Sequence, residues 1–122
     1  MESTRQQKFA RLIQKELSQL FLHDGPSIYG KAFVTITNVK ATPDLSIARV
    51  YLSILAVPDR EKAVDEINEA TNKIRGLLGL RIKQQVRHIP QLVFFLDDSL
   101  DYVEKIERLL KEANVGKDTS NS

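Results

Sequence analysis

The residues best suited to chemistry in this sequence are five bases in a stretch without acidic side chains. No Asp or Glu occurs from Thr71 to Leu96. The bases of this stretch are Lys73, Arg75, Arg81, Lys83 and Arg87. Solvated surfaces normally mix both signs of charge, so a run of one sign is typical of a surface that binds a polyanion. We expect these side chains to contact RNA phosphates; an ordinary solvated face is the alternative.

A second group of bases accompanies the first amphipathic stretch. Its apolar residues recur at about 100° per residue and form one stripe of a helix. They are Phe9, Leu12, Ile13, Leu17, Leu20 and Phe21. Lys8, Arg11 and Lys15 fall together on another side. The pattern predicts a core helix with a basic flank, and it leaves open whether that flank binds RNA or is ordinary solvated charge.

Residues with the types and spacing for catalysis or metal binding are not found. His23 and His88 have no metal-ligand spacing to each other or to a carboxylate. Asp44 is expected to tie a turn, and Asp97-Asp98-Ser99 to cap a helix. There is no cysteine, no phosphate-binding glycine loop and no nucleophile elbow. The sequence predicts a protein that is not an enzyme and uses no catalytic residue, metal, cofactor or small-molecule substrate.

Length and composition indicate one small domain. The 122 residues carry a net charge of +2, and a chain of this size can bury roughly two-thirds of its unfolded surface. No apolar run reaches the length of about 18 residues needed to span a bilayer, and the N-terminus lacks the apolar region of a signal peptide. We therefore expect a cytoplasmic protein that does not contact membranes.

The elements that must position the bases begin with a helix that starts at Ser3 or Thr4. It should stop at Asp24-Gly25-Pro26, because Pro lacks the amide needed to continue it. Strands are predicted at Phe33–Val39 and Ile47–Leu55, paired antiparallel. The second strand should bury Ala48, Val50, Leu52 and Ile54, and its wetter face should carry Arg49, Tyr51 and Ser53.

The acid-free stretch is expected to continue a helix that begins after Asp59 and runs through to Ile82. That pattern is longer than most globular helices, and the poor helix formers Thr71 and Asn72 lie in its middle, so we predict a break there. Gly76-Leu77-Leu78-Gly79 spells the GxxG loop of KH domains. Its two leucines continue the apolar stripe, which favours a helix over a phosphate-binding loop.

The last part of the domain is expected to be a strand at Leu92–Leu96 after Pro90, followed by a helix. The apolar stripe of that helix is Leu100, Val103, Ile106, Leu109 and Leu110. We predict a single α+β domain over residues 1–113, with helices on one face of a three-stranded sheet, and a disordered tail over 114–122.

Aromatic side chains are expected to pack in the core rather than to bind bases. Phe33, Phe94 and Phe95 lie in the predicted strands. A platform for base stacking therefore has little support, and recognition of phosphates and of the shape of folded RNA fits better.

In three places the sequence resembles the ribosome-binding factor A family. They are ATNKIRGLLG at 70–79, PQLVFFLDDS at 90–99 and DLSIARVYLS at 44–53. The similarity covers about Arg5 to Leu110 in the family's order and spacing, which makes it more specific than any single motif.

This resemblance implies a KH-like domain of the second topological type, in the order α-β-β-α-kink-α-β-α, where a kink between two helices replaces the GxxG loop. It implies binding to the small ribosomal subunit and its rRNA during late assembly and processing, and support of growth at low temperature. The family's kink reads Ala-x-Gly and is Ala70-Thr71-Asn72 here; Asn tolerates left-handed backbone, so we expect a kink to persist. The protein should be monomeric when free. The alternative is an interaction module whose basic helix docks an acidic partner.

Overall fold

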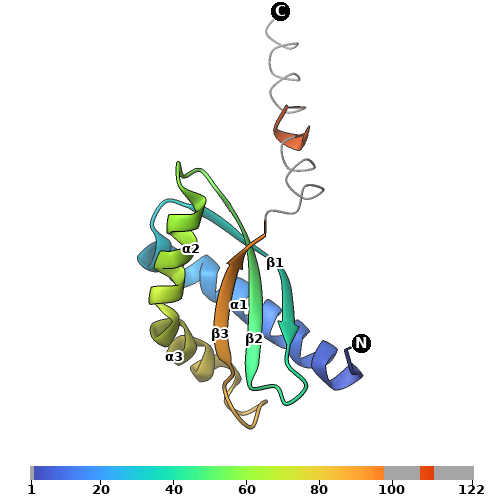
Figure 1. The fold of residues 1–122 in the computed structure, drawn as a ribbon. Coiled ribbons are helices and arrows are strands. Elements are labelled where there is room, and N and C mark those ends of the chain that lie inside the picture. The colour runs from blue at the N-terminus through green and yellow to red at the C-terminus, as the bar shows by residue number, and fades with distance from the viewer. Residues whose placement is uncertain (1, 98–107, 112–122) are drawn as a thin grey trace, which may run out of the picture.

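The computed structural model describes residues 2–97 and 108–111. Its helices are α1 (Thr4–Tyr29), α2 (Arg60–Glu69) and α3 (Thr71–Ile82), and its strands are β1 (Phe33–Ala41), β2 (Ile47–Leu55) and β3 (Gln91–Leu96). The strands form one sheet in the order β1-β2-β3, in which β1 is antiparallel and β3 parallel to β2. The helices pack on one side of this sheet, and no described element covers the other side (Figure 1). The predicted α+β architecture is confirmed.

One apolar core lies between the sheet and the helices. Ile13 of α1, Ile67 of α2 and Leu78 of α3 are all fully buried in it. The sheet contributes the alternate residues of β2 that were predicted to be inside, Ala48, Val50, Leu52 and Ile54. The other face of β2 was predicted to be more exposed to solvent, but its residue Ser53 is also buried. Ser53 pairs with Thr35 of β1.

Helix α1 is longer than predicted, because Asp24-Gly25-Pro26 does not end it. Its start agrees with the prediction, since Ser3 and Gln6 form a capping box. The helix continues past Pro26 to Gly30, whose φ of 70° ends it. Tyr29 packs edge-on against Phe21 and donates a hydrogen bond to the Phe21 carbonyl oxygen at 3.2 Å. This packing offsets the one backbone hydrogen bond that the proline removes.

The predicted break between two helices is present and lies at Ala70, which separates α2 from α3. Ala70 has φ −90° and ψ 11°, and the Thr71 hydroxyl donates to the Asn68 carbonyl oxygen at 2.6 Å. The expectation that Asn72 supplies left-handed backbone is wrong, since Asn72 is helical and has no positive φ. A single residue outside helical geometry is enough to change the direction of the chain.

Strand β3 agrees with the prediction to within one residue. The predicted final helix lies mostly outside the described residues; 108–111 are helical. The prediction that three phenylalanines pack in the core is correct for Phe94, which is 1% exposed. It is wrong for Phe33 and Phe95, which are 63% and 39% exposed. Strand alternation explains the exposure of Phe95, because the side chain of its neighbour Phe94 lies on the buried face of the sheet.

Candidate nucleic-acid interface

Helix α3 points its bases in three directions. At about 100° per residue, its buried residues define an inner side. They are Ile74, Leu78 and Ile82. Arg75 and Arg81 lie on the two flanks of that side, whereas Lys73 and Lys83 lie on the outer side. The structure therefore divides these four bases into two arginines beside the buried side of α3 and two lysines on its outer side.

Arg75 is half-buried and connects α3 to the segment before β3. Its Nε donates to the Pro90 carbonyl oxygen at 2.9 Å, and its Nη2 donates to the Ile89 carbonyl oxygen at 3.0 Å. These bonds use two of the five guanidinium N–H groups, so three remain for another acceptor. Arg75 thus positions the entry to β3, and its contact with RNA stays a prediction.

Arg81 connects α3 to α1. Its Nε lies 2.8 Å from Glu16 Oε2, and its Nη2 donates to Gln19 Oε1 at 2.5 Å. The side chains of Arg81 and Glu16 are 33% and 14% exposed. A carboxylate at this distance offsets much of the positive potential of Arg81, so it attracts phosphate less than an unpaired base does.

Lys73 and Lys83 are exposed on the outer side of α3. The Lys73 ammonium makes one long hydrogen bond, 3.4 Å to Ser27 Oγ, and Lys83 has no side-chain partner among the described residues. Gly76 lies on the same side, and a Cβ placed there would meet no atom within 4 Å. The surface at Gly76 is therefore low enough for an RNA backbone to approach closely.

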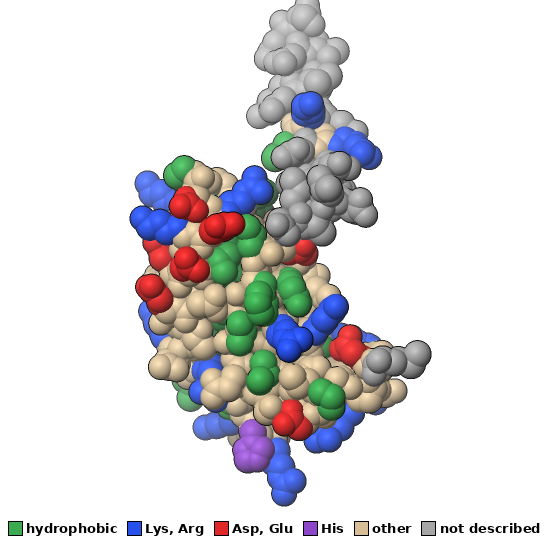
Figure 2. Space-filling view, in the orientation of Figure 1, with side chains coloured by type: hydrophobic (Ala, Val, Ile, Leu, Met, Phe, Trp, Pro, Cys, Tyr) green, Lys and Arg blue, Asp and Glu red, His purple; other side chains and the backbone are tan. Residues whose placement is uncertain are grey.

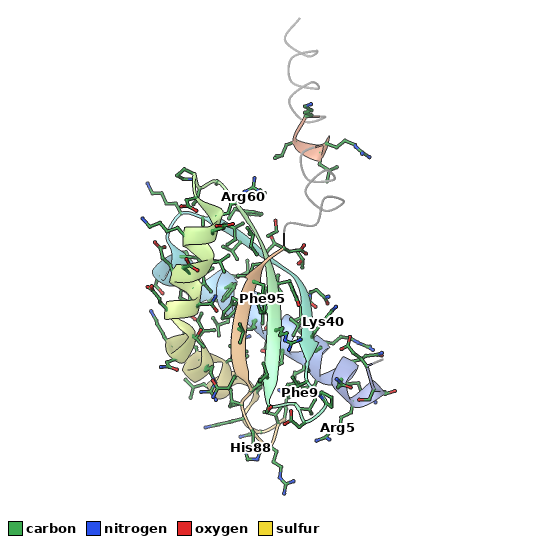
Figure 3. The ribbon with its side chains drawn as sticks, in the orientation of Figure 1. Arg5, Phe9, Lys40, Arg60, His88 and Phe95 are labelled. Carbon is green, nitrogen blue, oxygen red and sulfur yellow. The ribbon has the colours of Figure 1, made fainter. Side chains whose placement is uncertain are left out.

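Arg87 lies in the loop beyond α3 and lines a hollow of about 380 Å³. The other lining residues are Arg5, Phe9, Asp44, Leu45, Gln85, Val86 and His88. Figure 3 shows Arg5, Phe9 and His88 at this end of the molecule. Sequence reasoning missed Arg5, because only the tertiary fold brings the start of α1 beside this loop.

Asp44 reduces the positive charge of this hollow. Its Oδ1 accepts hydrogen bonds from Ser46 Oγ at 2.8 Å, from the Ser46 amide at 3.1 Å and from Thr42 Oγ1 at 2.8 Å. These bonds, those from Ser46 first, lower the pKa of the Asp44 carboxyl. The prediction that Asp44 ties the turn is confirmed.

Lys8, Arg11 and Lys15 are exposed on α1, on the side opposite its buried stripe. Arg11 is turned toward β1, where it lines a shallow hollow with Gln14 and Asn38. The fold therefore does not bring Arg11 to the outer side of α3. Whether these three bases bind RNA stays a prediction.

The GxxG sequence is not a loop, as the apolar stripe predicted. All four residues lie within α3, and Leu78 is fully buried. Gly79 faces the segment before β3, where a Cβ would meet Ile89 Cγ1 at 3.4 Å. That distance is an ordinary van der Waals contact, so Gly79 packs against Ile89 and does not form a phosphate-binding loop.

Among residues 2–97 and 108–111, no group of three or more His, Asp or Glu side chains is arranged to hold a metal ion. None of the helices described is long and apolar enough to cross a membrane.

The sheet topology, the broken α2–α3 pair and the basic outer helix define a KH-like domain in which a helical junction takes the place of the loop. Solved structures agree on the fold. Ribosome-binding factor A from Thermus thermophilus matches with a TM-score of 0.61 and 19% identity, over 75% of this chain and 94% of the other. A homology model of the Thermus thermophilus protein, fitted into a cryo-electron microscopy map of its 30S complex, matches with a TM-score of 0.54 and 20% identity, over 69% and 86%.

Sequence comparison identifies the family. The family model for ribosome-binding factor A matches residues 5–110. Ribosome-binding factor A of Cytophaga hutchinsonii is 44% identical over 96% of this chain and 88% of its own length. The Flavobacterium johnsoniae protein of the same name is 38% identical over 90% and 85%. The chain belongs to the ribosome-binding factor A family.

Proposed function

We propose that this protein is a non-enzymatic assembly factor that binds the small ribosomal subunit and its rRNA late in maturation. Family membership supports the class of function, and the Thermus relative fitted into a 30S complex supports the partner. We further infer that it acts as a monomer in the cytoplasm, and that its binding supports rRNA processing and growth at low temperature.

The outer side of α3 is the proposed RNA-binding surface. The observation that carries it is the pair Lys73 and Lys83, exposed on either side of Gly76 in a stretch without acids. Lys83 and Arg87 supply phosphate contacts near the end of α3, and Lys73 supplies one near the α2–α3 junction. Arg75 and Arg81 hold α3 in place through their protein partners and add contacts at its flanks.

The test compares the double variant Lys73→Glu/Lys83→Glu with Arg60→Glu/Lys62→Glu on α2. Both change the net charge by −4, and all four side chains are exposed. Co-sedimentation with purified small subunits is measured over a range of salt concentrations. Loss of two phosphate contacts should lower the salt slope of log K by about 1.4, at about 0.7 per contact. The α2 variant should keep the wild-type slope; equal slopes for all three proteins would overturn the assignment.

An acidic protein partner is the second candidate, favoured by Leu80. This side chain is 71% exposed on the same side of α3 as the two lysines. An apolar anchor inside a basic surface suits a protein interface. Replacing Leu80 with Gln should leave rRNA binding unchanged if the surface binds phosphates. A loss of subunit binding without a loss of binding to isolated rRNA would favour the protein partner.

A further inference from the structure

The open face of the sheet carries aromatic side chains where a solvated face is usually polar. The strand register places Lys40, Arg49 and Val93 in one row and Asn38, Tyr51 and Phe95 in the next. Val93 is 37% exposed and Phe95 is 39% exposed. Figure 2 shows a hydrophobic patch in the middle of this face, with basic side chains beside it. An exposed apolar patch on a sheet is a candidate binding surface.

Tyr51 and Phe95 form a stacked pair on this face. They come from neighbouring strands, their ring centroids are 5.4 Å apart, and their planes differ by 25°. Rings that project from adjacent strands of an open sheet are the means by which sheet-based RNA-binding domains stack bases. Such stacking tolerates any sequence, because every base has a π face.

Two exposed basic side chains lie beside the stacked pair. Lys40 of β1 and Arg49 of β2 face each other in the register, and both are exposed. Neither side chain has a hydrogen-bond or ion-pair partner among the described residues. Arg49 is two residues from Tyr51, or about 6.6 Å along the strand. The backbone phosphate of a nucleotide whose base stacks on the aromatic pair is therefore within reach of the guanidinium.

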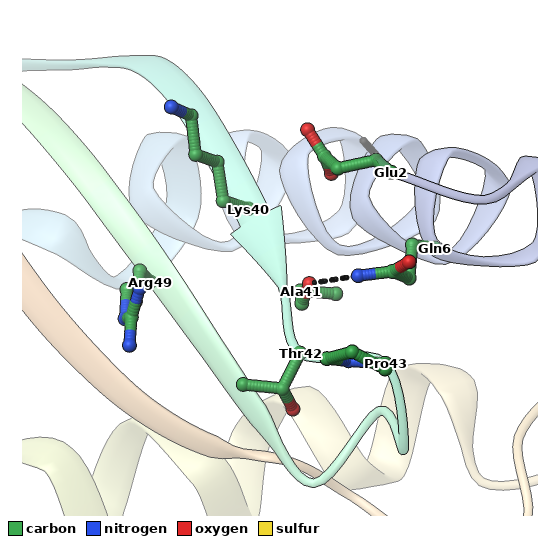
Figure 4. A pocket seen from close by; sticks show the side chains of 7 residues that line it. All are labelled: Glu2, Gln6, Lys40, Ala41, Thr42, Pro43 and Arg49. Carbon is green, nitrogen blue, oxygen red and sulfur yellow. Dashed lines mark hydrogen bonds between the residues drawn. The ribbon is translucent and has the colours of Figure 1, made fainter.

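A hollow of about 520 Å³ extends this basic end of the face. Figure 4 shows Lys40 and Arg49 projecting from adjacent strands, and the Gln6 amide donating to the Ala41 carbonyl oxygen at 2.9 Å. Glu2 also lines the hollow. At the other end of the face, Asp97 Oδ2 accepts from Thr37 Oγ1 at 2.5 Å. The potential thus favours phosphates near Lys40 and Arg49 rather than near Asp97.

We propose that this open face binds a single-stranded RNA segment, with a base stacked on the exposed Phe95, whose ring itself stacks on Tyr51, and with phosphates at Arg49 and Lys40. A docked protein could also bury Val93 and Phe95. Lys40 and Arg49, which have no side-chain partner among the described residues, lie beside two near-parallel rings. A nucleotide chain matches this arrangement better than a protein does, because it offers both a flat ring and a negative charge. The proposal deepens the proposed function and rests on it for the choice of RNA, but it uses the face of the sheet opposite the helices.

The experiment measures binding of the full chain to a fluorescein-labelled, unstructured 12-nucleotide RNA by fluorescence anisotropy. Phe95→Leu keeps apolar bulk without a ring, and Phe95→Tyr keeps the ring. Loss of one stacked base should weaken binding by roughly 5- to 150-fold for the Leu variant. The Tyr variant should bind like wild type. Lys40→Gln/Arg49→Gln should lower the salt slope by about 1.4, at about 0.7 per phosphate.

The outcomes separate this proposal from the role of α3. If the Leu variant binds the oligonucleotide with wild-type affinity, the stacking platform is overturned. That result would not bear on the role of α3, which the Lys73→Glu/Lys83→Glu experiment on subunits tests separately. Equal losses for Phe95→Leu and Phe95→Tyr also overturn stacking. A Leu variant that binds the oligonucleotide normally but no longer sediments with subunits indicates a protein partner and overturns the RNA assignment. If the Leu variant does not fold, the salt slope of the Lys40→Gln/Arg49→Gln variant decides, and an unchanged slope overturns the proposal.

Discussion

Helices α2 and α3 are separated by a single residue, yet their net charges are opposite in sign. Each buries three apolar residues on the same core. The outer side of α2 carries four exposed acids, Glu61, Asp65, Glu66 and Glu69. α3 has none. Two bases of α3 serve the fold, because Arg75 and Arg81 bond to protein groups. The packing of the two helices is otherwise alike, so it does not account for the exposed lysines Lys73 and Lys83, for which we propose RNA binding as the reason.

The ends of the two helices support this interpretation. Helix α2 is capped by Asp59, whose side chain accepts from the Lys62 amide at 3.0 Å, and Glu61 lies in its first turn. Both features suit the positive N-terminal end of a helix dipole. Helix α3 starts at Ala70 without a side-chain cap and has Lys73 in its first turn. Lys73 therefore costs α3 some stability, as is common where a residue serves binding.

The largest predicted effect tests whether the buried sides of the two helices are equivalent. Ile67→Ala in α2 and Ile74→Ala in α3 each remove a fully buried side chain. Each should lower the free energy of unfolding by about 2–5 kcal/mol, from lost burial and a residual cavity. Urea denaturation measures both. A much smaller loss for Ile74→Ala would show that α3 is held less firmly than α2, and the comparison of their surfaces would lose its basis.

A smaller effect is expected where a side chain of α2, but none of α3 among the described residues, is tied to a strand of the sheet. Asn68 Nδ2 donates to the Phe94 carbonyl oxygen, and Asn68 Oδ1 accepts from the Phe94 amide, both at 2.9 Å. Asn68→Ala should cost about 1–3 kcal/mol, because both backbone groups lose their partner. The neighbouring exposed Glu69→Ala is the control and should change the free energy of unfolding by less than about 0.5 kcal/mol. Ala is the best helix former, so helix propensity cannot cause a loss in either variant. A similar loss in both would mean that a general disturbance at the end of α2, and not the tie to β3, is responsible.

Sequence patterns predicted some features of this fold and missed others. Strand β2, the Asp59 cap and the interruption near Thr71 follow from alternation, capping chemistry and helix propensity. These signals are local, and the structure agrees with them. The continuation of α1 through Pro26 was missed because the Tyr29 ring, eight residues from its partner Phe21, decides it.

The candidate site was predicted less completely than the fold, because tertiary contacts determine which of its basic side chains are exposed and which have protein partners. The sequence spacing of Arg75 and Arg81 does not reveal their protein partners. Arg75 bonds to the carbonyl oxygen of Pro90, and Arg81 pairs with the carboxylate of Glu16. The exposure of Phe95 could have been inferred from strand alternation, once Phe94 was assigned to the core. Sequence therefore indicates which stretch is basic, and only the fold distinguishes its structural arginines from its exposed lysines.

The smallest predicted effect has the opposite sign and would make the start of α3 resemble that of α2. Lys73→Glu places an acid at the third position of α3 and should raise the free energy of unfolding by about 0.3–1 kcal/mol at low salt. Lys83→Glu makes the same charge change at the other end of the helix, where the dipole favours a cation, so it should lower the free energy by a similar amount. Urea denaturation at low and at 1 M salt measures both shifts, which should shrink together as salt screens them. Both variants should nevertheless weaken RNA binding. If Lys73→Glu makes the protein more stable but weakens its RNA binding, then binding, not folding, keeps a lysine at this position. Stability shifts of the same sign in both variants would contradict the dipole argument.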